Sequence, residues 1–358
     1  MNPPPTPAVP NPTLSPPGQV VGRMQAVEIR RHGGPEVLDV GDRPVPRPGA
    51  GEALVRNAFI GLNFVDLHHR AGTAYPVELP LVPGTEATGV VVAVGEGVSA
   101  NLLGRKVVHL GHLSGTYAEQ TAVNLRHLVP LRDDALLDQV AAVGLAGTTA
   151  HVLVRVVADV QARIVVVYAA AGGTGGAVVQ LALAEGACVI AVASTPERAR
   201  VASRLGAHAT IAVSDVDGFG GLADRLRMLT GGRGADYVFD ATGADTYAAS
   251  LRMLAPGGTL VVYGAATGHP APFSVSDLSG LTGVPGLSGS LGVRWVSAGD
   301  YLTGGIREQA VTAVLADLDA GRLSPRIAAV MPLAEATRAH SLMAARSFTG
   351  KVLLRPPS

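Results

Sequence analysis

The chain has 358 residues, a length sufficient for two domains that each have a hydrophobic core. Its 28 Lys and Arg residues are balanced by 28 Asp and Glu residues, so net charge gives no indication of binding to nucleic acid or to an anionic membrane. Hydrophobic residues form 47% of the chain but are interspersed with glycine, so we expect no membrane span and a soluble, cytoplasmic protein. A single cysteine, Cys188, excludes an internal disulfide and agrees with a reducing compartment.

The first part of the chain divides into a tail and a β-rich region. Residues 1–22 are proline-rich and uncharged, a composition typical of a disordered tail. From Met24 to Val123, short alternating apolar segments broken by Pro and Gly predict a barrel-like β domain. Residues 133–160 are expected to form two helices, the second beginning near Gly147.

The segment from Arg163 to Ala187 predicts a strand, a glycine turn and a buried helix. The β-branched run from Ile164 to Tyr168 suits a strand buried on both faces. The turn that follows is crowded with residues that lack a Cβ atom: Gly172, Gly173, Gly175 and Gly176. A helix N-terminus behind such a turn binds phosphate. The alternative interpretation is a tight turn without a ligand, as any α/β protein can have. It stays open because Val178 stands where the dinucleotide fingerprint has Gly or Ala. A second strand, from Cys188 to Ala193, completes a βαβ unit and favours dinucleotide binding; we interpret Cys188 as a packing residue of that strand.

The end of the second strand indicates which dinucleotide is bound. An NAD site usually has an acidic residue there, whereas this chain has Ser194, with Arg198 one helical turn further on. A hydroxyl and a guanidinium suit a 2′-phosphate, so the sequence favours NADPH. Alternatively, Ser194 or Thr195 caps the next helix, with Pro196 in its first turn, and both interpretations are compatible.

Alternating strands and helices continue toward residue 295. Strands are expected at residues 207–211, 237–240, 259–263 and 287–295, and helices at 222–229 and 305–321. This order predicts a doubly wound parallel sheet, in which ligands bind outside the carboxyl ends of the strands. A last strand, 351–354, is expected to pair with the N-terminal domain.

Five segments together resemble the medium-chain dehydrogenase/reductase superfamily, and within it the zinc-independent quinone oxidoreductases of the zeta-crystallin type. They read GLNFVDLHHRAGTAYP, LPLVPGTEATGVVVAVGEGV, AAAGGTGGAVVQLA, ADYVFDATG and TGKVLL. The resemblance implies an α/β protein with a GroES-like β-rich catalytic domain, residues 23–147 and 297–358, and a doubly wound parallel-sheet (Rossmann) cofactor domain, residues 148–296.

Departures from the zinc-dependent members of the superfamily are also visible. The chain has Asn63 near the position of their cysteine ligand and Thr85-Glu86 in place of their His-Glu pair, and it lacks their structural cysteines. We therefore expect no metal, and we interpret the adjacent His68 and His69 as surface or cleft residues rather than ligands.

The resemblance also implies roles for particular residues. Asn63 and Tyr75 match cleft residues near the nicotinamide and the substrate, and we expect them to stabilise negative charge that develops on the substrate oxygen. The expected cofactor-binding residues are Thr149, Gly172, Gly173, Thr174, Gly175, Ser194, Arg198, Thr242, Tyr263, Gly264, Ala265, Leu291 and Val293.

These features lead to one favoured function and two alternatives. The favoured function is an NADPH-dependent, zinc-independent reductase that transfers hydride to a quinone. The alternatives are an enone or enoyl reductase acting on a biosynthetic intermediate, and a protein that binds NADPH without catalysis. We expect a small-molecule electrophile as partner, and a homodimer formed through residues 287–295.

Overall fold

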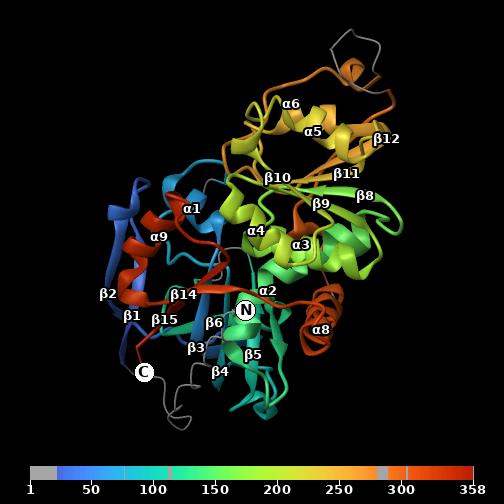
Figure 1. Cartoon of the computed structure of the whole chain (residues 1–358). Helices are drawn as coiled ribbons and strands as arrows, with labels where there is room; N and C mark the ends of the chain where they lie inside the picture. Colours follow the sequence, from blue (N-terminus) through green and yellow to red (C-terminus); the bar gives the residue numbers. More distant parts are fainter. Residues whose placement is uncertain (1–21, 76, 112–114, 280–288, 304, 358) are drawn as a thin grey trace.

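The computed structural model describes residues 22–75, 77–111, 115–279, 289–303 and 305–357. Figure 1 shows two lobes, each organised around one β-sheet, with the first and last parts of the chain in one lobe and the middle of the chain in the other. The tail predicted at residues 1–22 lies outside the described residues except for Gly22. The domain boundaries remain a prediction, and the one at residue 147 falls inside a helix.

One lobe contains a seven-stranded sheet and a separate two-stranded sheet, β1 and β2. The larger sheet has the order β14-β15-β3-β4-β5-β7, with β6 paired to β3. The closing strand β15 lies antiparallel to β3, so the chain returns to its N-terminal lobe as the sequence predicts. The strands are β1 Arg23–Ile29, β2 Leu38–Pro44, β3 Glu52–Leu62, β4 Glu86–Val94, β5 Lys106–Leu110, β6 Gln120–Asn124, β7 Leu128–Pro130, β14 Ile327–Pro332 and β15 Lys351–Arg355; the helices are α1 Phe64–Ala71 and α9 Ala336–Ala344.

The other lobe contains a parallel six-stranded sheet of order β10-β9-β8-β11-β12-β13, which confirms the doubly wound prediction. Its strands are β8 Ile164–Val167, β9 Cys188–Ala193, β10 Ala209–Ala212, β11 Ala235–Asp240, β12 Leu254–Val262 and β13 Gly292–Trp295. The helices of this part of the chain are α2 Leu137–His151, α3 Gly173–Ala184, α4 Pro196–Arg204, α5 Leu222–Leu229, α6 Tyr247–Met253, α7 Ala298–Tyr301 and α8 Ile306–Asp319.

Helices cover both faces of the parallel sheet, and the strand sequences explain why. Side chains alternate between the two faces of a strand. In β8, Val165 and Val167 pack into the core with α2 and α3, whereas Val166 packs into the core with α5 and α6. All three valines are fully buried, which is why this strand reads as a continuous β-branched run.

Within residues 133–160 the chain forms one continuous helical segment, Leu137–Val157, not the two helices expected from the sequence. Helix α2 continues directly into a π-helix at Val152–Val157. Gly147 lies inside the helix and does not break it. A Cβ atom at this position would lie 2.7 Å from Val314 Cγ1, so glycine allows α8 to pack closely against α2. By length and composition the segment Leu137–Val157 could cross a membrane, but 67% of its most apolar window is buried inside the protein. We therefore describe it as a core helix.

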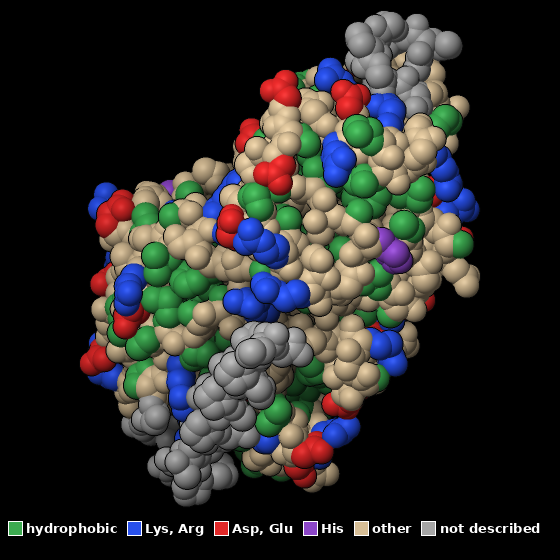
Figure 2. Space-filling model, in the orientation of Figure 1, with side chains coloured by type: hydrophobic (Ala, Val, Ile, Leu, Met, Phe, Trp, Pro, Cys, Tyr) green, Lys and Arg blue, Asp and Glu red, His purple; other side chains and the backbone are tan. Residues whose placement is uncertain are grey.

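Two other expectations need correction. Cys188 is exposed and does not pack in the core, because it is the first residue of β9 and lies at the amino end of the sheet. Helix α3 begins at Gly173 rather than at Ala177, so three of the four turn glycines belong to the helix itself. On the face shown in Figure 2, acidic and basic side chains are intermixed over both lobes, in keeping with the balanced composition.

Candidate functional site

The glycine turn between β8 and α3 forms a cradle in which one position, Gly175, accepts only glycine. A Cβ atom on Gly175 would lie 2.3 Å from the Ala169 carbonyl oxygen, well inside van der Waals contact. Gly172 is the N-cap of α3, with extended backbone at φ −87° and ψ −178°, and its carbonyl accepts the N–H of Gly176 at 3.0 Å. The N–H groups of the residues between them belong to the first helical turn, where no intrahelical acceptor exists. This geometry fits the pyrophosphate of a dinucleotide.

The other lobe touches this turn directly. Gly172 forms an isolated parallel β-bridge with Gly350, the residue before β15. The next residue, Lys351, brings its Cδ within 3.7 Å of the point where a Cβ of Gly173 would stand. The end of the chain therefore closes one side of the predicted cofactor cleft, with a lysine side chain beside the phosphate cradle.

Lys351 belongs to a buried polar network that also contains Glu86 and Asn63. The side chains of Lys351 and Glu86 are 5% and 1% exposed and form an ion pair between Nζ and Oε1. The second carboxylate oxygen of Glu86 accepts the backbone N–H of Leu145 at 2.6 Å. Lys351 Nζ also donates to Asn63 Oδ1 at 2.6 Å. The sequence did not point to Lys351, and it drew attention to Glu86 only because Thr85-Glu86 replaces the His-Glu pair of zinc-dependent relatives. The pairing could not be foreseen, because Glu86 in β4 and Lys351 in β15 are more than 250 residues apart in the chain.

Asn63 is held firmly by this network. Its Nδ2 donates to Glu86 Oε1 at 2.8 Å, to Thr85 Oγ1 at 3.1 Å and to the Gly61 carbonyl at 3.2 Å. The residue also begins α1, where its backbone N–H donates to Asp66 Oδ2 at 2.8 Å in a capping box. Both amide hydrogens of Asn63 thus have acceptors inside the protein.

The end of β9 carries the residues expected to select NADPH. Thr195 is the N-cap of α4, so the capping interpretation is confirmed for this residue, while Ser194 is exposed. The Arg198 guanidinium extends toward the other lobe and donates to the carbonyl oxygens of Arg346 and Phe348, the latter at 3.1 Å. The backbone of Arg346 therefore contacts Arg198 near the carboxyl end of β9. No sequence signal connects two residues that are 148 positions apart.

The loop after β11 is organised by a buried carboxylate. One oxygen of Asp240 accepts the N–H of Thr242 at 2.7 Å, and the other accepts the hydroxyls of Thr246 at 2.6 Å and Ser250 at 2.9 Å. Burial raises the pKa of Asp240, and these hydrogen bonds oppose the increase. The Thr242 carbonyl in turn accepts the N–H of Thr267 at 2.8 Å. The network fixes Thr242 beside the carboxyl end of β11.

The carboxyl end of β12 carries three more of the predicted residues. The Tyr263 N–H donates to the Asp240 carbonyl at 2.9 Å, and a Cβ on Gly264 would lie 2.9 Å from the Ala241 carbonyl oxygen. These contacts hold Tyr263, Gly264 and the buried Ala265 next to the loop after β11. Burial raises the pKa of the Tyr263 hydroxyl, which lies in the core rather than in the cleft.

The remaining predicted cofactor residues are more dispersed. Thr149 lies on α2, partly buried. Leu291 precedes β13 and Val293 lies within it, toward the amino end of this parallel strand. The structure therefore does not bring these two to the edge of the sheet where Ala265 lies; the carboxyl end of β13 is formed by Trp295.

Tyr75 lies in a cluster of rings where α1 meets the loop after β12. Its ring centroid is 5.5 Å from that of His68 and 6.3 Å from that of His269, and both pairs have edge-to-face geometry. His269 Nε2 makes a 3.2 Å hydrogen bond with the Ala74 carbonyl, which joins the two lobes. Burial raises the pKa of Tyr75, so its hydroxyl remains protonated at neutral pH.

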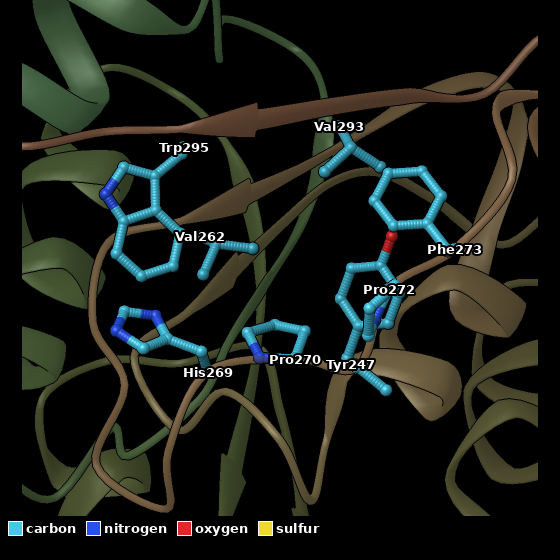
Figure 3. Close-up of a pocket in the computed structure, with 9 residues that line it drawn as sticks. Tyr247, Val262, His269, Pro270, Pro272, Phe273, Val293 and Trp295 are labelled. Carbon is cyan, nitrogen blue, oxygen red and sulfur yellow. The ribbon is translucent and has the colours of Figure 1, made fainter.

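A pocket of about 430 Å³ lies on the other side of His269. Figure 3 shows His269 and Trp295 close to each other along one side, with Tyr247 and Phe273 at the opposite end. Its lining residues are Tyr247, Val262, His269, Pro270, Ala271, Pro272, Phe273, Val293 and Trp295. Within the ranges that the structure describes, no group of three or more His, Cys, Asp or Glu side chains is arranged to hold a metal ion.

A parallel sheet with a glycine turn after its strand β8 and a mainly antiparallel lobe that contacts this turn are typical of a two-domain dehydrogenase or reductase. Comparisons with known proteins agree with this class. Residues 49–133 match the family model for the alcohol dehydrogenase GroES-like domain, and residues 173–294 match the model for zinc-binding dehydrogenases.

The similar proteins give the family. A 2-haloacrylate reductase from a Burkholderia species is 36% identical, with 93% of this chain and 99% of that enzyme covered. A quinone oxidoreductase from Pseudomonas aeruginosa is also 36% identical, over 92% of this chain and 99% of its own length. The Escherichia coli quinone oxidoreductase, solved with NADPH, has a TM-score of 0.86 at 31% identity and covers 93% of this chain and 100% of its own. The chain belongs to the quinone oxidoreductase family of the medium-chain dehydrogenase/reductase superfamily.

Proposed function

We propose that this protein is an NADPH-dependent reductase that transfers hydride to a quinone. The observation that carries the proposal is the glycine cradle at Gly172 to Gly175, set against a cleft closed by Lys351. Similarity to enzymes named quinone oxidoreductases, some solved with NADPH, supports the same function. NADPH, when bound, supplies the hydride.

Residues of both lobes would hold this cofactor. The first-turn N–H groups of α3 would bind the pyrophosphate, because they have no acceptor within the helix. Ser194 and Arg198 would bind the 2′-phosphate, since they lie at and just after the carboxyl end of β9 and a guanidinium pairs well with phosphate. The loops after β11 and β12 would border the nicotinamide.

A second candidate activity is the reduction of a carbon–carbon double bond conjugated to a carbonyl or carboxylate. The observation in its favour is the 36% identity to the 2-haloacrylate reductase. Both activities add hydride to an electron-poor acceptor and leave negative charge on an oxygen, so the same cleft serves either. Binding of NADPH without catalysis is the third candidate.

We also propose that the reaction needs no zinc and that the protein is a cytoplasmic homodimer. Asn63 and the Thr85-Glu86 pair stand where zinc-dependent relatives have ligands, and Asn63 is hydrogen bonded to Glu86 instead. The edge strand β13 and the nearby exposed side chains of Phe273, Val275 and Trp295 offer an apolar sheet edge for a second copy. Light scattering should then give twice the 36.3 kDa mass of the chain.

The experiment that tests the proposed activity is an acceptor panel. Chelator-treated protein is supplied with NADPH and, in separate reactions, with naphthoquinone, an α,β-unsaturated ketone and 2-chloroacrylate, and with NADP⁺ and a primary alcohol. Rapid oxidation of NADPH by naphthoquinone supports the proposal. Turnover with the alkenes alone moves the function to alkene reduction, and binding of NADPH without turnover by any acceptor supports the non-catalytic candidate.

A further inference from the structure

The cleft needs a hydrogen-bond donor for the acceptor oxygen, and the two residues expected to provide it are not equally free to do so. Asn63 donates through Nδ2 to three acceptors of its own lobe, so no amide hydrogen is left for a substrate. Tyr75 contacts the rings of His68 and His269. The His68 imidazole, which contacts the rings of both Tyr75 and Phe64, is a third candidate for this role.

His68 lies on α1, five residues after Asn63, in a position that the helix fixes. Its ring packs between Phe64, at a centroid distance of 5.7 Å, and Tyr75, at 5.5 Å. Its Nδ1 is 2.7 Å from Thr73 Oγ1, in the loop that follows the helix. These three contacts hold the ring in one orientation without using its second nitrogen.

The second nitrogen of His68, Nε2, is shielded from solvent and has no hydrogen-bond partner of normal geometry among the described residues. The backbone of Ala265, after the carboxyl end of β12 where the nicotinamide is expected, lies close enough to the His68 ring to affect its pKa. A buried polar atom without a partner is costly, and such atoms are often explained by a ligand that the site is built to bind.

The protonation state of His68 agrees with a donor that stays neutral. Burial lowers its pKa, the positive charge of a protonated His269 lowers it further, and the backbone of Ala265 opposes both effects. We assign the tautomer in which the Thr73 hydroxyl donates to Nδ1 and the neutral ring carries its hydrogen on Nε2.

We propose that His68 is the catalytic hydrogen-bond donor to the acceptor's carbonyl oxygen, and that Thr73 is the positioning residue that fixes its tautomer. The proposal rests on the proposed carbonyl-reducing function. When a quinone accepts hydride at one oxygen, two electrons enter the ring, both carbon–oxygen double bonds become single bonds as the ring becomes aromatic, and negative charge appears on the other oxygen. The Nε2–H bond stabilises this charge, and a proton from solvent completes the hydroquinone, so His68 itself neither gains nor loses a proton.

Two amide substitutions separate the nitrogens of the ring. His68→Gln places its amide nitrogen near the position of Nε2, whereas His68→Asn places it near Nδ1, where it can still meet Thr73. We expect kcat with naphthoquinone to fall about a hundredfold in His68→Asn and to recover to within about fivefold of the wild type in His68→Gln, while the Kd for NADPH is unchanged in both. NADPH binding can be followed by the fluorescence of Trp295, the one tryptophan of the chain. Equal kcat values for the wild type and His68→Asn would overturn the proposal.

A second readout does not require turnover. The infrared carbonyl stretch of carbon-13-labelled naphthoquinone, bound to protein saturated with NADP⁺, should shift to lower frequency in the wild type and in His68→Gln, but not in His68→Asn. A shift that is the same in all three proteins, or absent from the wild type, contradicts the role of His68. A shift that depends on His68 in a protein that does not oxidise NADPH would uphold the role of His68 and reject only the quinone-reductase activity.

Discussion

The buried ion pair between Lys351 and Glu86 connects the end of the chain to the cleft, and Lys351→Met tests what it contributes. The substitution keeps an apolar stem of similar length and leaves the carboxylate of Glu86 buried without its cation. Removing one partner of a buried pair typically costs 3–5 kcal/mol. Two donors remain on Glu86, Asn63 Nδ2 and the Leu145 N–H, so we expect a loss near the lower limit, about 3 kcal/mol of unfolding free energy at pH 7.

The assay is guanidinium unfolding followed by far-UV circular dichroism. The double variant Lys351→Met/Glu86→Gln removes both charges and should recover at least about 1 kcal/mol relative to Lys351→Met alone, because the two sites are coupled. Arg338→Met, which breaks the exposed pair with Glu335, is the control and should change stability little. Additive effects of the two substitutions, with Lys351→Met as stable as the control, would refute the reasoning.

Four further predictions concern the cradle, the 2′-phosphate site and two buried titratable groups. Gly175→Ala should weaken NADPH binding measured by calorimetry at least about tenfold, because its Cβ would meet the Ala169 carbonyl, whereas Gly305→Ala, with open space around it, should bind normally. Arg198→Ala should raise the KM for NADPH about tenfold and leave that for NADH unchanged; equal effects on both would remove Arg198 from the 2′-phosphate site. Burial raises the pKa of Asp66 to about 7, above its unfolded value, so the ionisation of this group lowers the free energy of unfolding as pH rises from about 4 to 7. In urea unfolding, the stability of Asp66→Asn relative to the wild type should therefore increase by up to about 4 kcal/mol over that interval. Parallel pH profiles of the two proteins would contradict this. Burial lowers the pKa of His109 to about 3, below its unfolded value, so stability should fall by up to about 4 kcal/mol as pH decreases from 6.5 to 3, and His109→Gln should flatten that acid limb of the unfolding profile.

The parallel-sheet lobe could be predicted from the sequence because its signals are local. The β-branched run at Ile164, the glycines after it and the strand from Cys188 to Ala193 are each determined by neighbours within a few residues. The continuous helix through Gly147 could not be predicted, because the close approach of Val314 that makes glycine suitable there involves a helix far along the chain.

The site residues likewise divide into those that local sequence predicts and those that depend on contacts between distant parts of the chain. The cradle glycines and the capping role of Thr195 follow from local pattern. The ion pair of Lys351 and the position of Arg346 next to Arg198 depend on the return of the chain to its first lobe, which spacing does not encode. The sequence predicts His68 only as a surface or cleft residue, because the burial of its Nε2 atom depends on how α1 packs in the folded protein.

The preference for NADPH over NADH in steady-state turnover tests most directly whether this site binds NADPH and passes its hydride to a quinone. The initial rate of nicotinamide oxidation is measured for the wild type with naphthoquinone, using NADPH and NADH in turn. We expect a kcat/KM at least about tenfold higher for NADPH, with one NADPH consumed for each quinone reduced. Equal use of the two cofactors, or no quinone-dependent oxidation of either, would contradict it.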